Sequence, residues 1–269
     1  MKRVILPFLL LLITALIYAC GSGGKKTETP EDTPGQEPAT QPAKIKLLPA
    51  VGAASYDNAE ISVNSPADGS AVDAGAVQFD FGVTNYELAT QTIDAETRGC
   101  ANSGKGQHIH LILNNQPYYA HYNNQFDREL EPGHYVMLAF LSRSYHESVK
   151  NNNSYALTQF TVGDAEATPA DLSAPHMFYS RPKGSYKGND TKKILLDFFL
   201  VNTTLAPDGN KVKATINGQE FTIDTWQPHF VEGLPMGENS FKLELVDKDG
   251  NYIEGPFNRV ERTVTLSEA

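Results

Sequence analysis

Apolar and polar side chains alternate along residues 107–113, which read Gln-His-Ile-His-Leu-Ile-Leu. Successive side chains point to opposite faces of a β-strand. The alternation therefore predicts a strand that buries Ile109 and Leu111 and presents His108 and His110 on its other face. The Asn-Asn pair that follows predicts a turn, and residues 118–121 predict the returning strand of a hairpin. Such a hairpin can pack a core and hold imidazoles together.

Short alternating runs separated by Gly, Pro and Asn turns continue to the C-terminus in two matching series. Residues 80–88 match 197–205, residues 108–116 match 211–219, residues 130–133 match 234–237, and residues 141–162 match 245–266 in length. Four matches in the same order predict an internal duplication. The pattern predicts an all-β protein with two tandem immunoglobulin-like β-sandwich domains, at 57–164 and 175–269, joined by a linker at 165–174.

The N-terminal segment has a different character. Lys2 and Arg3 precede a short apolar run that ends before Cys20, which predicts a signal peptide over residues 1–19. Residues 17–20, Ile-Tyr-Ala-Cys, resemble the lipobox of bacterial lipoproteins. The resemblance implies a lipid on Cys20 and an anchor in the outer membrane of a bacterial cell envelope, facing the periplasm or the cell surface. Residues 20–56 are rich in Gly, Thr, Pro, Glu and Lys, so we expect a disordered tether there.

Composition narrows the classes of partner. The formal net charge of −10 makes nucleic acid a poor candidate ligand. The expected partners are the membrane, through the lipid on Cys20, and a metal ion or a small anionic ligand. With Cys20 lipidated, Cys100 is the one thiol left, so no intramolecular disulfide is expected.

The two copies differ most in their histidines. Five of the seven histidines lie in the first copy, and the matching positions of the second carry ordinary charged residues. The first copy also has an insertion, residues 89–107, that contains Cys100. The predicted strand at 134–141 of the first copy places Val136, Leu138 and Phe140 on an outer face that is polar in the second copy. An apolar outer face needs a cover, and the insertion is the expected one.

The hairpin register predicts a metal site. In the second copy Asn217-Gly218 predicts that Ile216 pairs with Gln219, and the same register in the first copy pairs His108 with His121. His108, His110 and His121 would then share one face, a ligand set that suits zinc or copper. His134 and Cys100 are possible further ligands. The alternative is that these histidines are ordinary surface residues of an amphipathic hairpin and bind no metal.

Two other functions stay open. A metal-free surface interaction protein would bind an anionic, phosphorylated or glycan ligand through a second set of side chains: Tyr118, Tyr119, Arg143, Tyr145, His146 and Lys150. The loop that carries His146 could instead place this histidine near the metal, although a solvated loop is the simpler expectation. A metal-dependent hydrolase ranks last, because Glu147 is the only suggested general base and no nucleophile motif is present. A binding module is therefore expected, not an enzyme.

The first copy resembles a bacterial family of uncharacterised, secreted, histidine-rich immunoglobulin-like domains. The resemblance is carried by His-Ile-His-Leu-Ile-Leu at 108–113 and by Leu-Glu-Pro-Gly-His at 130–134, and it covers about 60 residues. Ile109 stands where members of the family often have another histidine. The resemblance implies export and an immunoglobulin-like fold, and it brings no established activity.

Overall fold

The computed structural model describes residues 44–269, which lie within one compact unit. Its regular secondary structure is almost entirely β-strand, as the alternation predicts. The predicted signal peptide at 1–19 and the predicted lipid on Cys20 lie outside the described residues. No helix within residues 44–269 has the length and apolar character that crossing a membrane requires.

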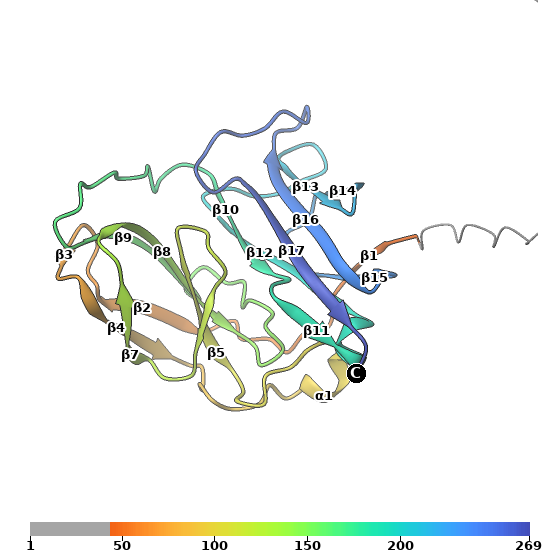
Figure 1. The fold of residues 1–269 in the computed structure, drawn as a ribbon, viewed down its shortest axis with the longest axis horizontal. Helices are drawn as coiled ribbons and strands as arrows, with labels where there is room; N and C mark the ends of the chain where they lie inside the picture. Colours follow the sequence, from red (N-terminus) through yellow and green to blue (C-terminus); the bar gives the residue numbers. More distant parts are fainter. Residues whose placement is uncertain (1–43) are drawn as a thin grey trace, which may run out of the picture. The chain divides into compact units, whose positions relative to one another are not determined.

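The first sandwich has two facing sheets, with strand orders β2-β4-β7 and β3-β9-β8-β5-β6 (Figure 1). Their inward side chains form one core that includes Phe79, Phe81, Ile109, Leu111 and Phe160. The elements are β2 (Glu60–Ser65), β3 (Ala71–Val72), β4 (Gly75–Thr84), α1 (Ala95–Arg98), β5 (His108–Leu113), β6 (Tyr119–His121), β7 (Gln125–Leu130), β8 (Gly133–Ser142) and β9 (Tyr155–Val162).

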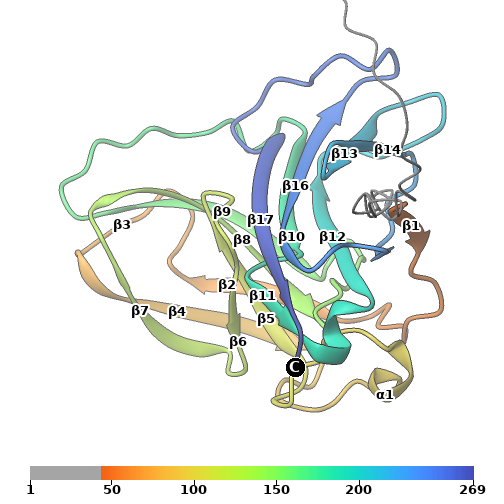
Figure 2. The same ribbon diagram turned by 45° about the vertical axis from the view of Figure 1, so that its right-hand side comes forward.

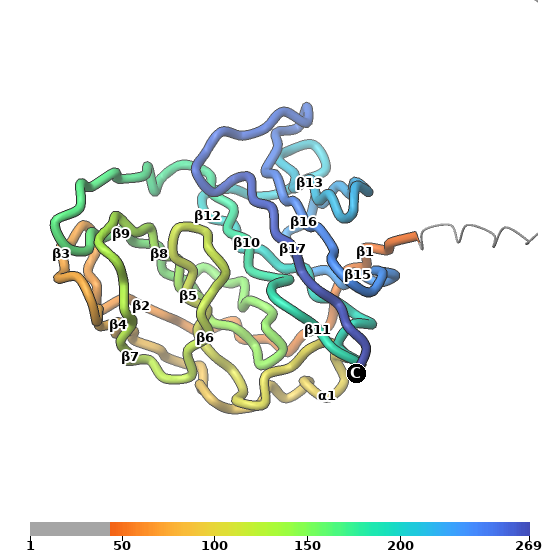
Figure 3. Tube along the Cα trace, viewed as in Figure 1, coloured from red at the N-terminus to blue at the C-terminus, as the bar shows by residue number. Residues whose placement is uncertain are grey.

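The second sandwich also has two sheets, with strand orders β1-β15-β12-β10 and β11-β17-β16-β13-β14 (Figure 2). The chain reaches it from β9 through residues 163–175, which contain no strand (Figure 3). Ile216 pairs with Gln219 across the Asn217-Gly218 turn, as predicted. The elements are β1 (Lys46–Pro49), β10 (His176–Arg181), β11 (Ser185–Lys187), the 3-10 helix η1 (Gly188–Thr191), β12 (Ile194–Val201), β13 (Lys211–Ile216), β14 (Gln219–Ile223), β15 (His229–Glu232), β16 (Gly237–Val246) and β17 (Arg259–Ser267).

The expected tether at 20–56 is wrong over its last residues, because β1 is an ordered edge strand of the second sandwich. Lys46 pairs with Glu232 and Pro49 with His229. Ile45 is buried in the core of the second sandwich, and Leu47 packs against it. The alternation Ile45, Leu47 is enough to form a short edge strand, and the composition of the surrounding segment hides it.

The outer face of β5 and β8 is covered by the second sandwich and not, as expected, by the insertion at 89–107. Val136, Leu138 and Phe140 belong to one buried cluster with Phe178 of β10 and Phe199 of β12. The rings of Phe140 and Phe199 stack with their centroids 4.9 Å apart. Burial of this apolar area favours a fixed arrangement of the two sandwiches over two freely jointed modules.

Candidate metal centre

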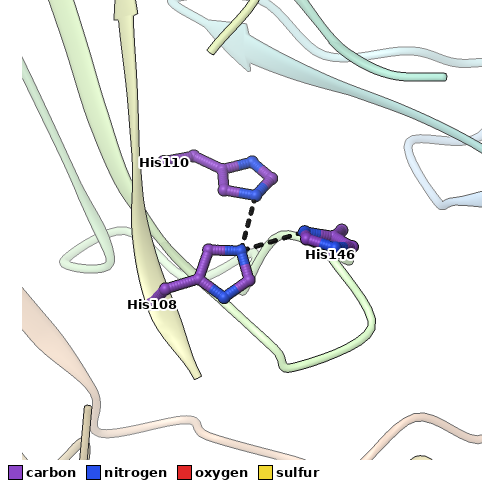
Figure 4. Close-up of side chains that lie close together, drawn as sticks. All are labelled: His108, His110 and His146. Carbon is purple, nitrogen blue, oxygen red and sulfur yellow. Dashed lines mark hydrogen bonds between the residues drawn. The ribbon is translucent and has the colours of Figure 1, made fainter. Parts of the chain in front are cut away.

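Three imidazoles meet at one point on the outer face of β5. His108 and His110 are two residues apart on this strand, so they share a face, and His146 lies on the loop between β8 and β9. His108 Nε2 is 2.9 Å from His110 Nε2 and 3.0 Å from His146 Nδ1 (Figure 4). All three ligand atoms lie within 4.8 Å of one another. We call these three residues the histidine cluster.

His146 reaches the histidine cluster because a tight turn follows β8. The amide of His146 donates to the carbonyl oxygen of Arg143, and the amide of Arg143 donates to that of Glu147. His146 has a φ of 69°, in the left-handed region that non-glycine residues seldom occupy. Because β8 runs antiparallel to β5 and pairs Ser142 with His108, this turn lies beside the start of β5.

A hydrogen bond at the far side of the His108 ring determines which of its two nitrogens is free. His108 Nδ1 is 2.8 Å from the carbonyl oxygen of Gly106. A carbonyl oxygen can only accept, so His108 Nδ1 carries the hydrogen, and in the neutral ring Nε2 keeps its lone pair. His110 Nδ1 is 3.1 Å from Ser180 Oγ, a hydroxyl on β10 of the second sandwich. Both sandwiches therefore contribute to the cluster.

The three rings are neutral because they are buried. His108 and His110 have no exposed surface, and His146 is mostly covered. Burial lowers the pKa of His108 to about 4, and the positive charges of Arg181 and Lys183 act in the same direction. The pKa values of His110 and His146 also lie well below the usual range for histidine, again mainly because of burial. Neutral imidazole is the form that coordinates metals.

Tyr118 closes one side of the histidine cluster and is not the exposed side chain that the interaction hypothesis expects. Its ring stacks on His110 with the centroids 3.5 Å apart, and its hydroxyl oxygen is 3.2 Å from His146 Nδ1. The side chain is 2% exposed. Tyr119 does lie on the surface, under the guanidinium of Arg128.

The predicted ligand His121 is not in the cluster, because the hairpin register differs by one residue from the expected one. His121 pairs with Ile109 and so points to the inner face, where its ring stacks on Phe126. The two strands are joined by five residues, 114–118, and not by a two-residue turn. A shift of one residue moves every side chain of the strand to the other face.

The two further predicted ligands also lie elsewhere. His134 shares the outer face, but it is eight residues from Ser142 along β8, a separation of about 26 Å in a strand. Its ring hydrogen-bonds to Thr161 and Gln159. Cys100 lies outside the group of candidate ligands, and burial raises the pKa of its thiol to about 11.

The loop residues proposed for an anionic ligand are engaged within the protein. Arg143 donates to the carbonyl oxygens of Ala54 and Ser148 and lies 3.4 Å from Glu147. Lys150 forms an ion pair with the fully buried Asp197 of β12. Tyr145 is also buried, with its hydroxyl 3.2 Å from Asp94. The loop is therefore a buried ionic network and not a solvated segment.

The sequence pattern predicted His108 and His110 as ligands, and it indicated His146 only as a possible neighbour of the metal. The available signal was the antiparallel pairing of β5 and β8, which brings the loop after Ser142, and with it His146, close to His108. No local signal identifies Ser180, because its contact with His110 depends on how the two sandwiches pack.

No protein-family model and no curated protein matches the chain. Among solved structures it is similar to fibronectin(III)-like modules of Clostridium thermocellum CbhA, with 10% identity, 78% of this chain and 95% of that chain covered, and a TM-score of 0.28. It is also similar to the Bacteroides ovatus SGBP-B of a mixed-linkage glucan utilization locus (10% identity, 78% and 48% covered, TM-score 0.24). A third likeness is to the tandem V-type regions of VCBP3, a v-region-containing chitin binding protein (9% identity, 77% and 99% covered, TM-score 0.23). At these TM-scores the similarities give no indication of function.

Proposed function

We propose that this protein is a binding module that holds a transition metal ion, zinc or copper, through His108 Nε2, His110 Nε2 and His146 Nδ1. The observation that carries the proposal is the close approach of three ring nitrogens, with separations of 2.9 and 3.0 Å, in a buried site. Imidazole nitrogen is a preferred ligand of both metals.

The hydrogen bonding within the histidine cluster supports a bound cation. His108 Nε2 has one lone pair and no hydrogen, yet it faces a nitrogen of both other rings. A single lone pair accepts one well-aligned hydrogen bond, so the two other rings cannot both form a good hydrogen bond to it. A metal ion removes this conflict because it accepts all three lone pairs at once.

Two of the three nitrogen–nitrogen distances in the histidine cluster are close to those of a metal site, and the third lies within 4.8 Å. Ligand nitrogens about 2.0–2.1 Å from a tetrahedral ion lie about 3.3–3.4 Å from each other. The two short separations in the histidine cluster are smaller by a few tenths of an ångström, which small ring rotations can correct. The contacts of His108 with Gly106 and of His110 with Ser180 would orient these ligands, as outer partners do at metal sites.

We propose binding and not hydrolysis because the suggested base is already paired. Glu147 accepts from Arg98 at 2.9 Å and lies 3.4 Å from Arg143, and its side chain is 4% exposed. Burial raises the pKa of Glu147, but each of its carboxylate oxygens already faces a guanidinium, which leaves neither oxygen free to act on a substrate. We also propose that the module is exported and held at the cell envelope by a lipid on Cys20. Labelling the chain with a radioactive fatty acid tests this proposal, and the label should be absent from Cys20→Ser.

Elemental analysis and metal titration of the full chain, purified in detergent, test the metal proposal. We expect one zinc or copper ion per chain and its loss in His108→Ala and His146→Ala. His134→Ala is the matched control, because His134 lies on the same outer face but outside the cluster. A wild-type chain that neither contains nor takes up either metal would disprove the proposal.

A further inference from the structure

Three cationic side chains gather next to the histidine cluster, on the side of the second sandwich. Arg181 ends β10, Lys183 follows it, and Arg262 comes from β17. Lys183 Nζ lies 3.7 Å from the centroid of the Tyr118 ring, whose stacking partner is His110. The Arg181 guanidinium lies 5.7 Å from the same centroid. We call Arg181, Lys183 and Arg262 the cation group.

The cation group has no acidic partner in the described chain. Within residues 44–269, none of its members forms an ion pair with a carboxylate. Arg181 is 7% exposed and donates to the hydroxyl of Tyr186, while its Nε finds no hydrogen-bond partner among these residues. In the same part of the chain Nη1 of Arg262 is likewise buried without a partner.

Two other buried arginines of this protein do have a carboxylate partner. Arg98 and Arg143 are as deeply buried as Arg181, and both pair with Glu147. A guanidinium buried without a counter-charge is strongly destabilising, since its desolvation is not offset. Within residues 44–269, Arg181 therefore lacks the carboxylate that offsets the charge of Arg98 and Arg143.

The cation group also opposes a bare metal ion. Lys183 and Arg181 lie 3.7 and 5.7 Å from the centroid of the Tyr118 ring that stacks on His110, and their positive field disfavours a divalent ion at the histidine rings. The cations repel one another as well: with burial, the charges of Arg181 and Arg262 lower the pKa of Lys183 to about 8. One negative charge beside this group would relieve both conflicts.

We infer that the cation group binds a small inorganic anion and that this anion and the metal ion of the histidine cluster strengthen each other's binding. The coupling rests on the proposed function, whereas the anion site does not. Lys183 is half-buried, so solvent reaches the group on this side. A methyl group added at the neighbouring Gly184 would meet no atom within 4 Å, so the turn there is open. Of the donors in the cation group, Arg181 Nε and Arg262 Nη1 have no hydrogen-bond partner among residues 44–269.

Sulfate tests the inference in the full chain, with perchlorate replacing it at constant ionic strength. We expect sulfate to tighten zinc binding about tenfold in the wild-type chain, within the usual range of coupling between two sites. Lys183→Gln should remove most of this effect. Lys187→Gln is the matched control, since Lys187 is an exposed lysine on the nearby β11, and it should behave like the wild type. Zinc affinity is measured by competition with a chromophoric chelator, corrected for zinc sulfate formation.

A second readout uses the metal-free chain, whose melting temperature sulfate should raise more in the wild type than in Lys183→Gln. If zinc binds equally well in sulfate and perchlorate, the coupling is wrong while the metal proposal survives. If no zinc binds, the metal proposal fails, and the melting temperatures alone decide the anion site. Equal stabilisation of all three chains by sulfate would reveal a general salt effect and overturn the anion site.

Discussion

His110 Nδ1 and Ser180 Oγ lie 3.1 Å apart although the two residues belong to different sandwiches. The hydroxyl holds the ring of His110 in the orientation that directs its Nε2 toward His108 and His146. The proposed metal site is therefore complete only when the two sandwiches are packed together.

Ser180→Ala should weaken metal binding about 10- to 100-fold, because it removes the outer partner that orients a ligand. Competition titration with zinc measures the change. Ser185→Ala, at an exposed position of β11, is the control and should leave the affinity unchanged. An unaltered affinity in Ser180→Ala would show that the packing of His110 against Tyr118 is sufficient to hold the ring.

His121→Ala should leave the metal content of the protein unchanged, because the side chain lies on the inner face against Phe126. The substitution removes a stacked ring and also a buried Nε2 that has no partner within residues 44–269, so we expect a small effect on stability. Elemental analysis beside His108→Ala checks the result. Loss of metal in His121→Ala would mean that the hairpin adopts the register predicted from sequence.

Acid should destabilise the metal-free protein. The pKa of His108 is about 4 in the folded chain and near 6.5 when unfolded, so between these values the unfolded state binds more protons. The free energy of unfolding should fall as the pH is lowered from 6.5 to 4, by about 3 kcal/mol for His108. Urea unfolding in chelator at several pH values measures it. The decline should be smaller in His108→Gln, and an equal decline in both chains would contradict a buried neutral imidazole.

Asp197→Asn should destabilise the protein by about 3 kcal/mol, because it leaves Lys150 without its buried counter-charge. The double variant Lys150→Met/Asp197→Asn removes both charges and should recover most of the loss. A double-mutant cycle from urea unfolding gives the interaction free energy directly. An interaction near zero would show that the ion pair between the sandwiches is solvated in the native protein.

The two sandwiches should unfold together. Trp226 is the single tryptophan and contacts Phe199, so its fluorescence reports the second sandwich and the contact between the two. Its transition should coincide with that of the far-ultraviolet circular dichroism, which reports both sandwiches. Phe199→Ala should lower the stability by about 3–5 kcal/mol, since the ring is fully buried. Two separate transitions in the wild-type chain would contradict a single cooperative unit.

Sequence patterns predicted what depends on local chemistry. The alternation around Ile109 and Leu111 identified β5 and its two faces. Asn217-Gly218 determined the register of the β13–β14 hairpin. Both signals act within a few residues. The same register failed at His121, where residues 114–118 form a longer connection. Asn115 within it hydrogen-bonds to Tyr179 of the second sandwich. That contact, like the one made by Ser180, is absent from any local pattern.

The pairing of β1 with β15 has a consequence for the order in which the second sandwich is completed as the chain is synthesised. Lys46 emerges among the first residues of the described chain, whereas its partner Glu232 emerges among the last. The first sandwich can fold from the segment between them, but β1 has no neighbouring strand until β15 has been synthesised. A fragment truncated before β15 would therefore leave the backbone of β1 unpaired.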